Sequence, residues 1–166
     1  MEKTIQFPFY QQENSKDDGR ACLRMISRFY GKENNFSDLG QLVLNKQTIN
    51  LLDMTRAAEE AGFKALVAPL TFDKLKDEVP LPAICHLTQG KFVVVHGLGN
   101  EQVYIADPSI RLGLEKQSEF DFRKNWSVDI NQQLKVFPQL FRYVKKTRLP
   151  DVGIALLLEP TPDFFS

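Results

Sequence analysis

Apolar residues in the first half of the chain recur at the three- and four-residue spacing of amphipathic helices. The clearest run lies between residues 21 and 30 and ends at Gly31. An aspartate just before it, at Asp17 or Asp18, suits a helix start, because a carboxylate accepts hydrogen bonds from free N–H groups and faces the positive end of the helix dipole. Three helices are predicted, at about residues 18–30, from Ser37 as the N-cap to Leu44, and from Leu51 to Ala61 with Gly62 closing it.

The second half changes to runs of β-branched and aromatic residues, separated by glycines. Helices first and antiparallel strands afterwards indicate an α+β domain, with N-terminal helices packed on an antiparallel β-sheet. The predicted strands are Phe63–Leu70, Pro82–Leu87, Phe92–Leu98, Gln102–Ala106 and Val152–Leu158. Short helices are predicted at Thr71–Val79, capped by Thr71, and at Ser118–Trp126.

Composition narrows the class of protein. The 166 residues are 43% hydrophobic and include 13 Phe, enough for one domain with a core. Twenty-one basic residues balance 21 acidic ones, so no nucleic-acid partner is expected. Two cysteines provide no disulfide framework, and no apolar run approaches the ~18 residues of a membrane span. The Cys and His residues at positions 22, 85, 86 and 96 lack the spacing of a zinc site, so we expect no metal and no cofactor.

Two stretches carry a specific pattern. The first opens with Gln12 and continues through residues 17–26 as DDGRACLRMI. The second runs LPAICH at residues 81–86, KFVVV at residues 91–95 and VYIADP at residues 103–108. Together they resemble the bacteriocin-processing, double-glycine cysteine peptidases that form the N-terminal domains of many ATP-binding-cassette (ABC) peptide exporters. That family reads Gln, then D-C-G-P-A-C-L-x-M, then H-F-V-V and A-D-P.

The resemblance implies a papain-like cysteine peptidase fold. In the family a Cys nucleophile sits at a helix N-terminus, a His lies on a strand, an Asp orients the His and the early Gln donates to the oxyanion. Here Asp18 stands at the Cys position and Lys91 at the His position, whereas Gln12 and Asp107 match. A carboxylate is no thiol nucleophile, and a lysine with a reference pKa of about 10.4 is a poor base near neutral pH. The degenerate site therefore comprises Gln12, Asp18, Lys91 and Asp107, the same residues are the candidates for a peptide-binding groove, and none is expected to be catalytic.

Substitution at both positions suggests that a charge pair replaces the thiolate and imidazolium. Asp18 would cap its helix and face the ammonium of Lys91, and Asp107 could make a second contact to Lys91. A pair is far less costly to bury than either charge alone. The alternative is that both residues are exposed and have little effect on each other.

Other nucleophiles fit less well. Cys22 lies one helical turn from Asp18 and reads as a buried apolar residue. Cys85 sits in an apolar run, and strand alternation directs Cys85 and His86 to opposite faces, so they form a poor dyad. An active thiol enzyme that cleaves leader peptides through Cys22 nevertheless stays open as an alternative.

The resemblance also divides the chain. Residues 1–159 form the predicted peptidase-like domain, with an extra segment at about residues 128–150. Residues 160–166 begin a predicted linker to a missing transmembrane region. The extra segment is amphipathic, and either packs locally or forms a lid or docking surface near the peptide groove.

Function is expected from the same resemblance. The leading hypothesis is a catalytically inactive domain that docks an extended peptide, a leader peptide or an unfolded protein cargo for transport. Its partners would be the transmembrane and ATP-binding regions of the exporter, and its place the cytoplasmic face of the bacterial inner membrane, with the domain itself soluble. Besides the active thiol enzyme, a structural or partner-docking domain without a peptide groove stays open.

Overall fold

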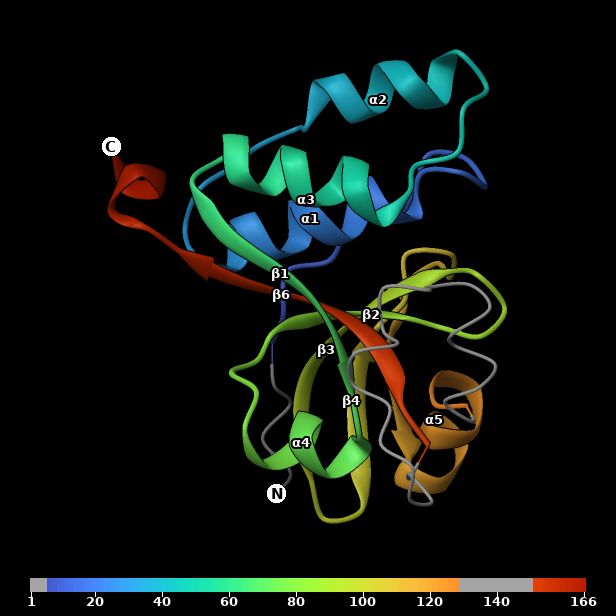
Figure 1. Ribbon diagram of the computed structural model, residues 1–166. Coiled ribbons are helices and arrows are strands. Elements are labelled where there is room, and N and C mark those ends of the chain that lie inside the picture. Colours follow the sequence, from blue (N-terminus) through green and yellow to red (C-terminus); the bar gives the residue numbers. More distant parts are fainter. Residues whose placement is uncertain (1–5, 129–150) are drawn as a thin grey trace, which may run out of the picture.

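The computed structural model describes residues 6–128 and 151–166. Three helices precede the sheet, and two short helices and a final turn of 3₁₀-helix accompany its strands (Figure 1). In chain order the elements are α1 (Asp18–Phe29), α2 (Ser37–Leu44), α3 (Leu51–Glu60), β1 (Phe63–Leu70), α4 (Phe72–Asp77), β2 (Ala83–His86), β3 (Phe92–Gly99), β4 (Gln102–Ala106), β5 (Leu114–Ser118), α5 (Glu119–Trp126), β6 (Gly153–Pro160) and η2 (Pro162–Phe165).

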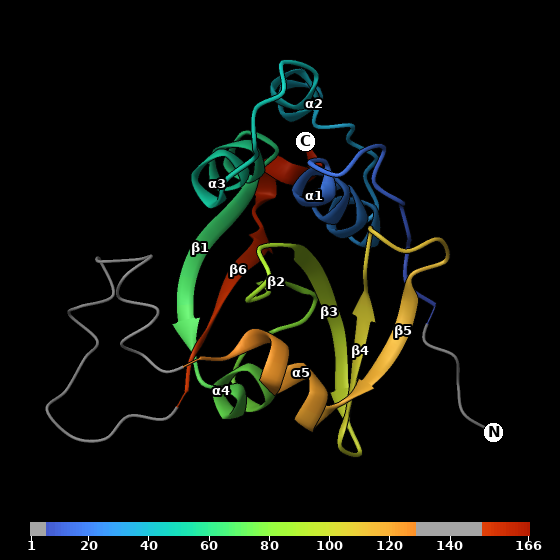
Figure 2. The ribbon, with the colours of Figure 1, turned by 90° about the vertical axis from the view of Figure 1, so that its right-hand side faces the viewer.

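The described strands form one antiparallel sheet in the order β1-β6-β2-β3-β4-β5. The last strand of the chain, β6, therefore lies between β1 and β2, and joins the first strand to the β2–β5 meander. Helices α1, α2 and α3 gather at one end of the sheet, and α4 and α5 lie toward the other (Figure 2). The predicted α+β class, with N-terminal helices on an antiparallel sheet, is confirmed.

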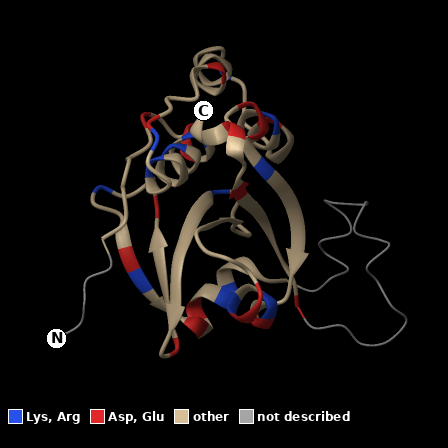
Figure 3. Cartoon of the chain, turned by 90° about the vertical axis from the view of Figure 1, so that its left-hand side faces the viewer, with Lys and Arg blue, Asp and Glu red and all other residues tan. Residues whose placement is uncertain are grey.

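Side-chain alternation along β3 explains why the sheet supports two cores. Val94 joins the core beneath α1 and α3, whereas Val93 and Val95 join a second core with Phe72 of α4 and Trp126 of α5. Successive residues of a strand point to opposite faces, so a continuous apolar run serves both layers. Charged residues of both signs are spread over the helices and strand ends (Figure 3).

Local sequence signals account for most helix starts. Thr71 caps α4 as predicted, because its hydroxyl accepts the Lys74 N–H. The prediction of Ser37 as a cap is wrong: the N-cap of α2 is Phe36, which adopts a left-handed backbone with φ 47°. Phe36 buries its ring and donates its N–H to the Asn34 side chain. These contacts place the N-cap of α2 at Phe36, one residue before Ser37.

Two further features differ from the sequence prediction. β5 is a polar edge strand that alternation did not reveal. In the β3–β4 pair, the register shifts between Val95 and Gly97, so that His96 is the extra residue of a β-bulge. A bulge re-aims a side chain, and the consequence for His96 is described below.

The last strand is fitted closely to α5. The Trp126 indole N–H donates to the Ile154 carbonyl at 2.9 Å, and a Cβ at Gly153 would lie 2.1 Å from Cε2 of that indole. Val128 and Val152 are bridged by two backbone hydrogen bonds. The predicted extra segment at about residues 128–150 lies, beyond Val128, outside the described residues. Over the described ranges, no helix combines the length and apolar character needed to cross a membrane.

Candidate functional site

Helix α1 places Asp18 against the sheet. Asp18 is the first residue of α1, and its Oδ2 accepts the backbone N–H of Phe92 on β3 at 2.8 Å. Asp17 holds the N-cap position, but its side chain makes no cap hydrogen bond. Instead, its Oδ2 accepts from the Glu13 N–H and from Arg20. Asp18, which was predicted to cap α1, thus ties that helix to β3.

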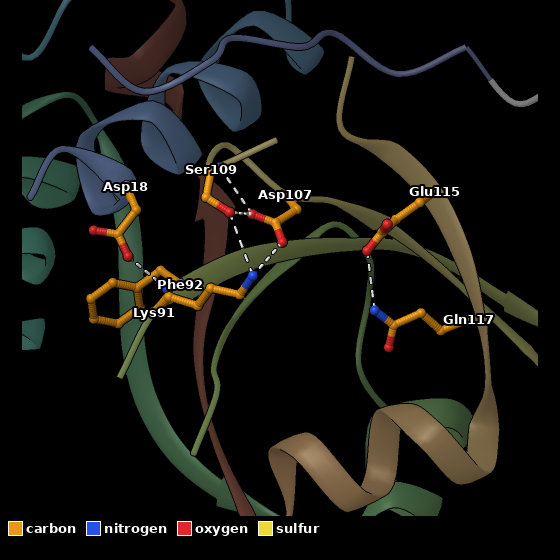
Figure 4. Close-up of polar contacts among 7 residues, drawn as sticks. All are labelled: Asp18, Lys91, Phe92, Asp107, Ser109, Glu115 and Gln117. Atoms are coloured by element: carbon orange, nitrogen blue, oxygen red, sulfur yellow. Dashed lines mark hydrogen bonds and ion pairs between the residues drawn. The ribbon is translucent and has the colours of Figure 1, made fainter. Parts of the chain in front are cut away.

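Lys91 precedes β3 and pairs with the carboxylate at the end of β4. Its Nζ lies 2.6 Å from Oδ2 of Asp107. The other oxygen of Asp107 accepts both the N–H and the hydroxyl of Ser109, at 2.9 and 2.6 Å. Figure 4 shows the three side chains converging. The predicted contact between Asp107 and Lys91 is therefore confirmed.

The predicted ion pair between Asp18 and Lys91 is wrong. In Figure 4 the Lys91 ammonium reaches Asp107, and the Asp18 carboxylate meets the backbone of Phe92 instead. Among the ion pairs of the described residues, none joins Asp18 to a base. The physical reason is that Asp18 is already satisfied by a backbone N–H, while the buried Asp107 needs a charged partner.

Gln12 reaches the same region through its backbone. Its N–H donates to the carbonyl of Pro108, the residue after Asp107, at 2.9 Å. Its side-chain Oε1 is buried without a hydrogen-bond partner in the described structure. Gln12, Asp107 and Lys91 are thus brought together, and Asp18 lies beside them through the neighbouring residues 91 and 92.

The pKa values of the carboxylates of Asp107 and Asp18 are shifted in opposite directions. Burial alone would raise the pKa of Asp107, but hydrogen bonds from Lys91 and Ser109 outweigh burial and lower it below its usual value. Burial raises the pKa of Asp18, and the hydrogen bonds from Phe92 and Gly19 offset this only in part. Asp107 is therefore held as an anion by its partners, whereas Asp18 is held mainly by backbone dipoles.

Both cysteines are fully buried. Cys22 is part of α1 and packs in the first core, and burial together with the charges of Asp18 and Asp107 raises the pKa of its thiol far above the ordinary value. Cys85 packs in the second core, and burial likewise raises the pKa of its thiol. A thiol in this state is not a nucleophile near neutral pH.

The sequence reasoning missed two participants. Ser109 binds Asp107 through its N–H and hydroxyl, and the turn signal Asp-Pro-Ser at residues 107–109 could have indicated it. His86 stacks on Phe92 with ring centroids 4.5 Å apart and interacts electrostatically with Asp18. Burial lowers the pKa of His86, so near neutral pH it contributes no positive charge to the site.

No other feature of the described chain competes as a chemical site. The residues that the structure describes include no cluster of His, Cys, Asp or Glu able to hold a metal ion. A cavity of about 810 Å³ lies beside α5 and the β3–β4 turn, and its lining contains none of the four candidate residues.

Curated relatives match most of the chain. A lactococcin transport/processing ATP-binding protein LcnC-like from Lactococcus lactis subsp. lactis is 26% identical over 163 residues, which cover 94% of this chain and 19% of the relative. The transport/processing ATP-binding protein ComA from Streptococcus pneumoniae is 27% identical over 162 residues, covering 92% of this chain and 19% of the relative. The chain thus spans about a fifth of the length of these relatives.

Solved structures show the same fold. The peptidase domain of Streptococcus ComA, described as a bi-functional ABC transporter, superposes with a TM-score of 0.70 at 24% identity, covering 94% of this chain and all of that one. A double glycine motif protease from an AMS/PCAT transporter, solved in complex with its leader peptide, gives 0.68 at 24% identity, covering 94% and 93%. The family model described as Peptidase C39 matches residues 6–131. The chain belongs to the peptidase C39 family.

Proposed function

We propose that this chain is a catalytically inactive C39 domain that docks an extended substrate or leader peptide for an exporter. The observation that carries the proposal is the set of contacts made by the side chains at positions 18 and 91. Asp18 is hydrogen-bonded to Phe92, and Lys91 is ion-paired with Asp107, so both side chains serve the fold. A carboxylate and an ammonium engaged in this way supply neither a thiolate nor a general base near neutral pH.

Relatives support the docking role. The leader-peptide complex of a double glycine motif protease concerns a protein of this fold, and the curated relatives are named as transport/processing ATP-binding proteins. By extension we propose that the docked ligand is a peptide or unfolded cargo, and that transmembrane and ATPase regions of an exporter are the partners. We place the domain at the cytoplasmic face of the membrane, with residues 160–166 beginning the connection to those regions.

The active-enzyme alternative is disfavoured by burial. Cys22 is 0% exposed and its thiol pKa is raised well above the ordinary value, so neither access nor ionisation suits acyl transfer. A purely structural role makes a different prediction from docking, namely that no leader peptide binds near residues 12, 18, 91 and 107.

Restoring the family residues tests the loss of chemistry. A synthetic leader peptide ending in two glycines and extended by a short cargo sequence is incubated with the native chain, with Asp18→Cys, with Lys91→His and with the double variant. We expect no cleavage by the native chain and cleavage after the double glycine by the double variant, because Asp107 and Gln12 remain in place. Mass spectrometry of the products measures this, and thiol alkylation should abolish it.

Peptide binding is measured on the same chains by fluorescence anisotropy. We expect the native chain to bind the uncleaved peptide. In NMR spectra of the complex we expect chemical-shift changes at residues 12, 18, 91 and 107. Steady cleavage by the native chain would contradict the proposed inactivity. Absence of binding, or shifts confined to the far end of the sheet, would contradict docking and favour the structural role.

A further inference from the structure

The segment before α1 is held to the body of the protein by several side chains, Phe7 and Tyr10 among them. We call residues 6–12 the N-terminal strap. Phe7 is 5% exposed and stacks on His96 of β3, with ring centroids 4.5 Å apart and an interplanar angle of 9°. The other neighbour of its ring is Phe29 of α1, at 5.5 Å. Phe7 therefore joins the strap to both the helical layer and the sheet.

His96 is held by stacking without hydrogen bonds. The β-bulge at this position directs its ring toward Phe7, and both imidazole nitrogens are buried with no partner in the described structure. Burying a neutral imidazole without hydrogen bonds costs free energy. Burying an imidazolium costs far more, because the imidazolium carries a charge and two N–H donors that would have no acceptor. The geometry thus requires the neutral form.

Among the residues that the structure describes, none offers a charge that would compensate for an imidazolium at His96. The strap contains no acidic or basic residue between Gln6 and Gln12. From β4 the ring that faces His96 is Tyr104, with centroids 6.4 Å apart, and from α1 the contact is made through Phe7 to Phe29. Burial is the sole cause of the shift that lowers the pKa of His96 to about 4, and no described acid or base adds to it.

The strap leads directly to the candidate site. Its last residue, Gln12, donates its N–H to the carbonyl of Pro108 beside Asp107. We propose that the Phe7–His96 stack is an acid-released latch, and that protonation of His96 frees the strap and withdraws Gln12 from the site. The release depends on the fold alone, whereas its effect on peptide docking rests on the proposed function.

Linkage sets the size of the effect. A histidine whose pKa is about 4 in the latched state and 6.5 when free favours the latched state fully above pH 6.5 and loses this preference as the pH falls toward 4. For this pair of pKa values, the population of the released strap rises about eightfold between about pH 7 and about pH 5.5. The latch therefore responds well above the pKa of the latched histidine.

Two NMR measurements on the native chain test the latch. The His96 imidazole is titrated directly, and exchange of the Gln12 amide is followed against pH after correction for the intrinsic exchange rate. We expect a His96 pKa far below 6.5 and about an eightfold gain in Gln12 opening over the range above. The variant His96→Phe retains a stacking ring without a titratable group and should remove the gain, whereas His86→Phe, the matched control at the other histidine, should keep it.

Specific outcomes would overturn the inference. An ordinary His96 pKa with the strap in place, or an unchanged pH response in His96→Phe, would contradict the latch. Leader-peptide affinity completes the test: it should fall with the pH in the native chain and stay level in His96→Phe. If the strap is released but the peptide affinity is the same across the pH range, the inference that the latch controls docking is contradicted. Absence of peptide binding at every pH would contradict the proposed function but would leave the latch, as measured by NMR, in place.

Discussion

Asp107 makes most of the side-chain contacts at the candidate site. It is 2% exposed, accepts from Lys91 through one oxygen and from Ser109 through the other, and orders the turn after β4. In the family pattern the matching aspartate orients a histidine. Here Asp107 neutralises a lysine, which agrees with the proposal that the catalytic partner has been replaced.

A pair of double-mutant cycles separates the two possible partners of Lys91. We expect Lys91→Met and Asp107→Asn to be coupled by about 1 kcal/mol in the free energy of unfolding, a modest value because Lys91 is 31% exposed. Lys91→Met and Asp18→Asn, the matched cycle, should show a smaller coupling. Urea unfolding measures both, and a larger coupling for the Asp18 cycle would contradict the observed pairing.

Acid should remove the contribution of Asp107. Its pKa is lowered in the folded state, so its stabilisation is present above the unfolded-state value of about 3.9 and is lost as the pH falls through the folded value. At neutral pH we expect Asp107→Asn to cost about 1–3 kcal/mol. The difference in urea midpoint between the native chain and this variant should shrink below about pH 4, and a difference that persists there would show that the loss is steric rather than electrostatic.

Two glycines in the sheet differ in what surrounds them, which gives a matched test at the scale of one strand. A Cβ at Gly153 of β6 would overlap the Trp126 indole, whereas a Cβ at Gly99 of β3 would meet no atom within 4 Å. We expect Gly153→Ala to lower the free energy of unfolding by about 2 kcal/mol or more, and Gly99→Ala to change it by less than about 0.5 kcal/mol. Thermal unfolding checks both, and equal effects would show that the indole moves aside at no cost.

The elements that could be predicted from sequence are those with a clear period or cap. The α1 run has helical spacing, the strands from Phe63 to Ala106 are apolar, and Thr71 caps α4 as expected. β5, by contrast, reads Leu-Glu-Lys-Gln-Ser and has one neighbouring strand, so its pairing with β4 depends on the partner rather than on its own pattern. The start of α2 likewise depends on the burial of Phe36, a tertiary effect.

The candidate site could be predicted as a set of residues, but of its contacts only the one between Lys91 and Asp107 was predicted correctly. The resemblance to the family placed Gln12, Asp18, Lys91 and Asp107 together. The choice of Lys91 between two nearby carboxylates depends on side-chain reach and on the N–H of Phe92, which occupies Asp18. Stacking of His96 on Phe7 depends on the β-bulge between Val95 and Gly97. A glycine inside a strand can mark such a bulge, but it does not indicate which ring the histidine will contact.

For the whole molecule, the bridge between Val128 and Val152 closes the fold around the segment that separates α5 from β6. The two residues exchange both backbone hydrogen bonds, at 2.9 and 3.0 Å, which is the arrangement that a two-residue hairpin turn requires. The described fold is therefore complete at this bridge, and residues 129–151 are replaceable in principle by Asn-Gly.

We expect that replacement to raise the free energy of unfolding by about 2 kcal/mol, because shortening the connection from about 23 residues to two lowers the entropy cost of closing the loop by about 0.6 kcal/mol per halving. Circular dichroism melts measure it. Val128→Pro, which removes one donor of the bridge, is the control and should destabilise the native chain. Unfolding of the shortened chain would show that the segment belongs to the core, and unchanged peptide affinity in a folded shortened chain would contradict a lid.

The hydrogen bond from Phe92 to Asp18 also has a consequence for the stability of any variant with a cysteine at position 18. A thiol accepts hydrogen bonds weakly, so the variant Asp18→Cys leaves the Phe92 N–H, at the contact between α1 and β3, without a good acceptor. We expect this to lower the free energy of unfolding by about 1–3 kcal/mol. Under the proposed inactivity, selection for stability alone would therefore retain an aspartate rather than a cysteine at this position.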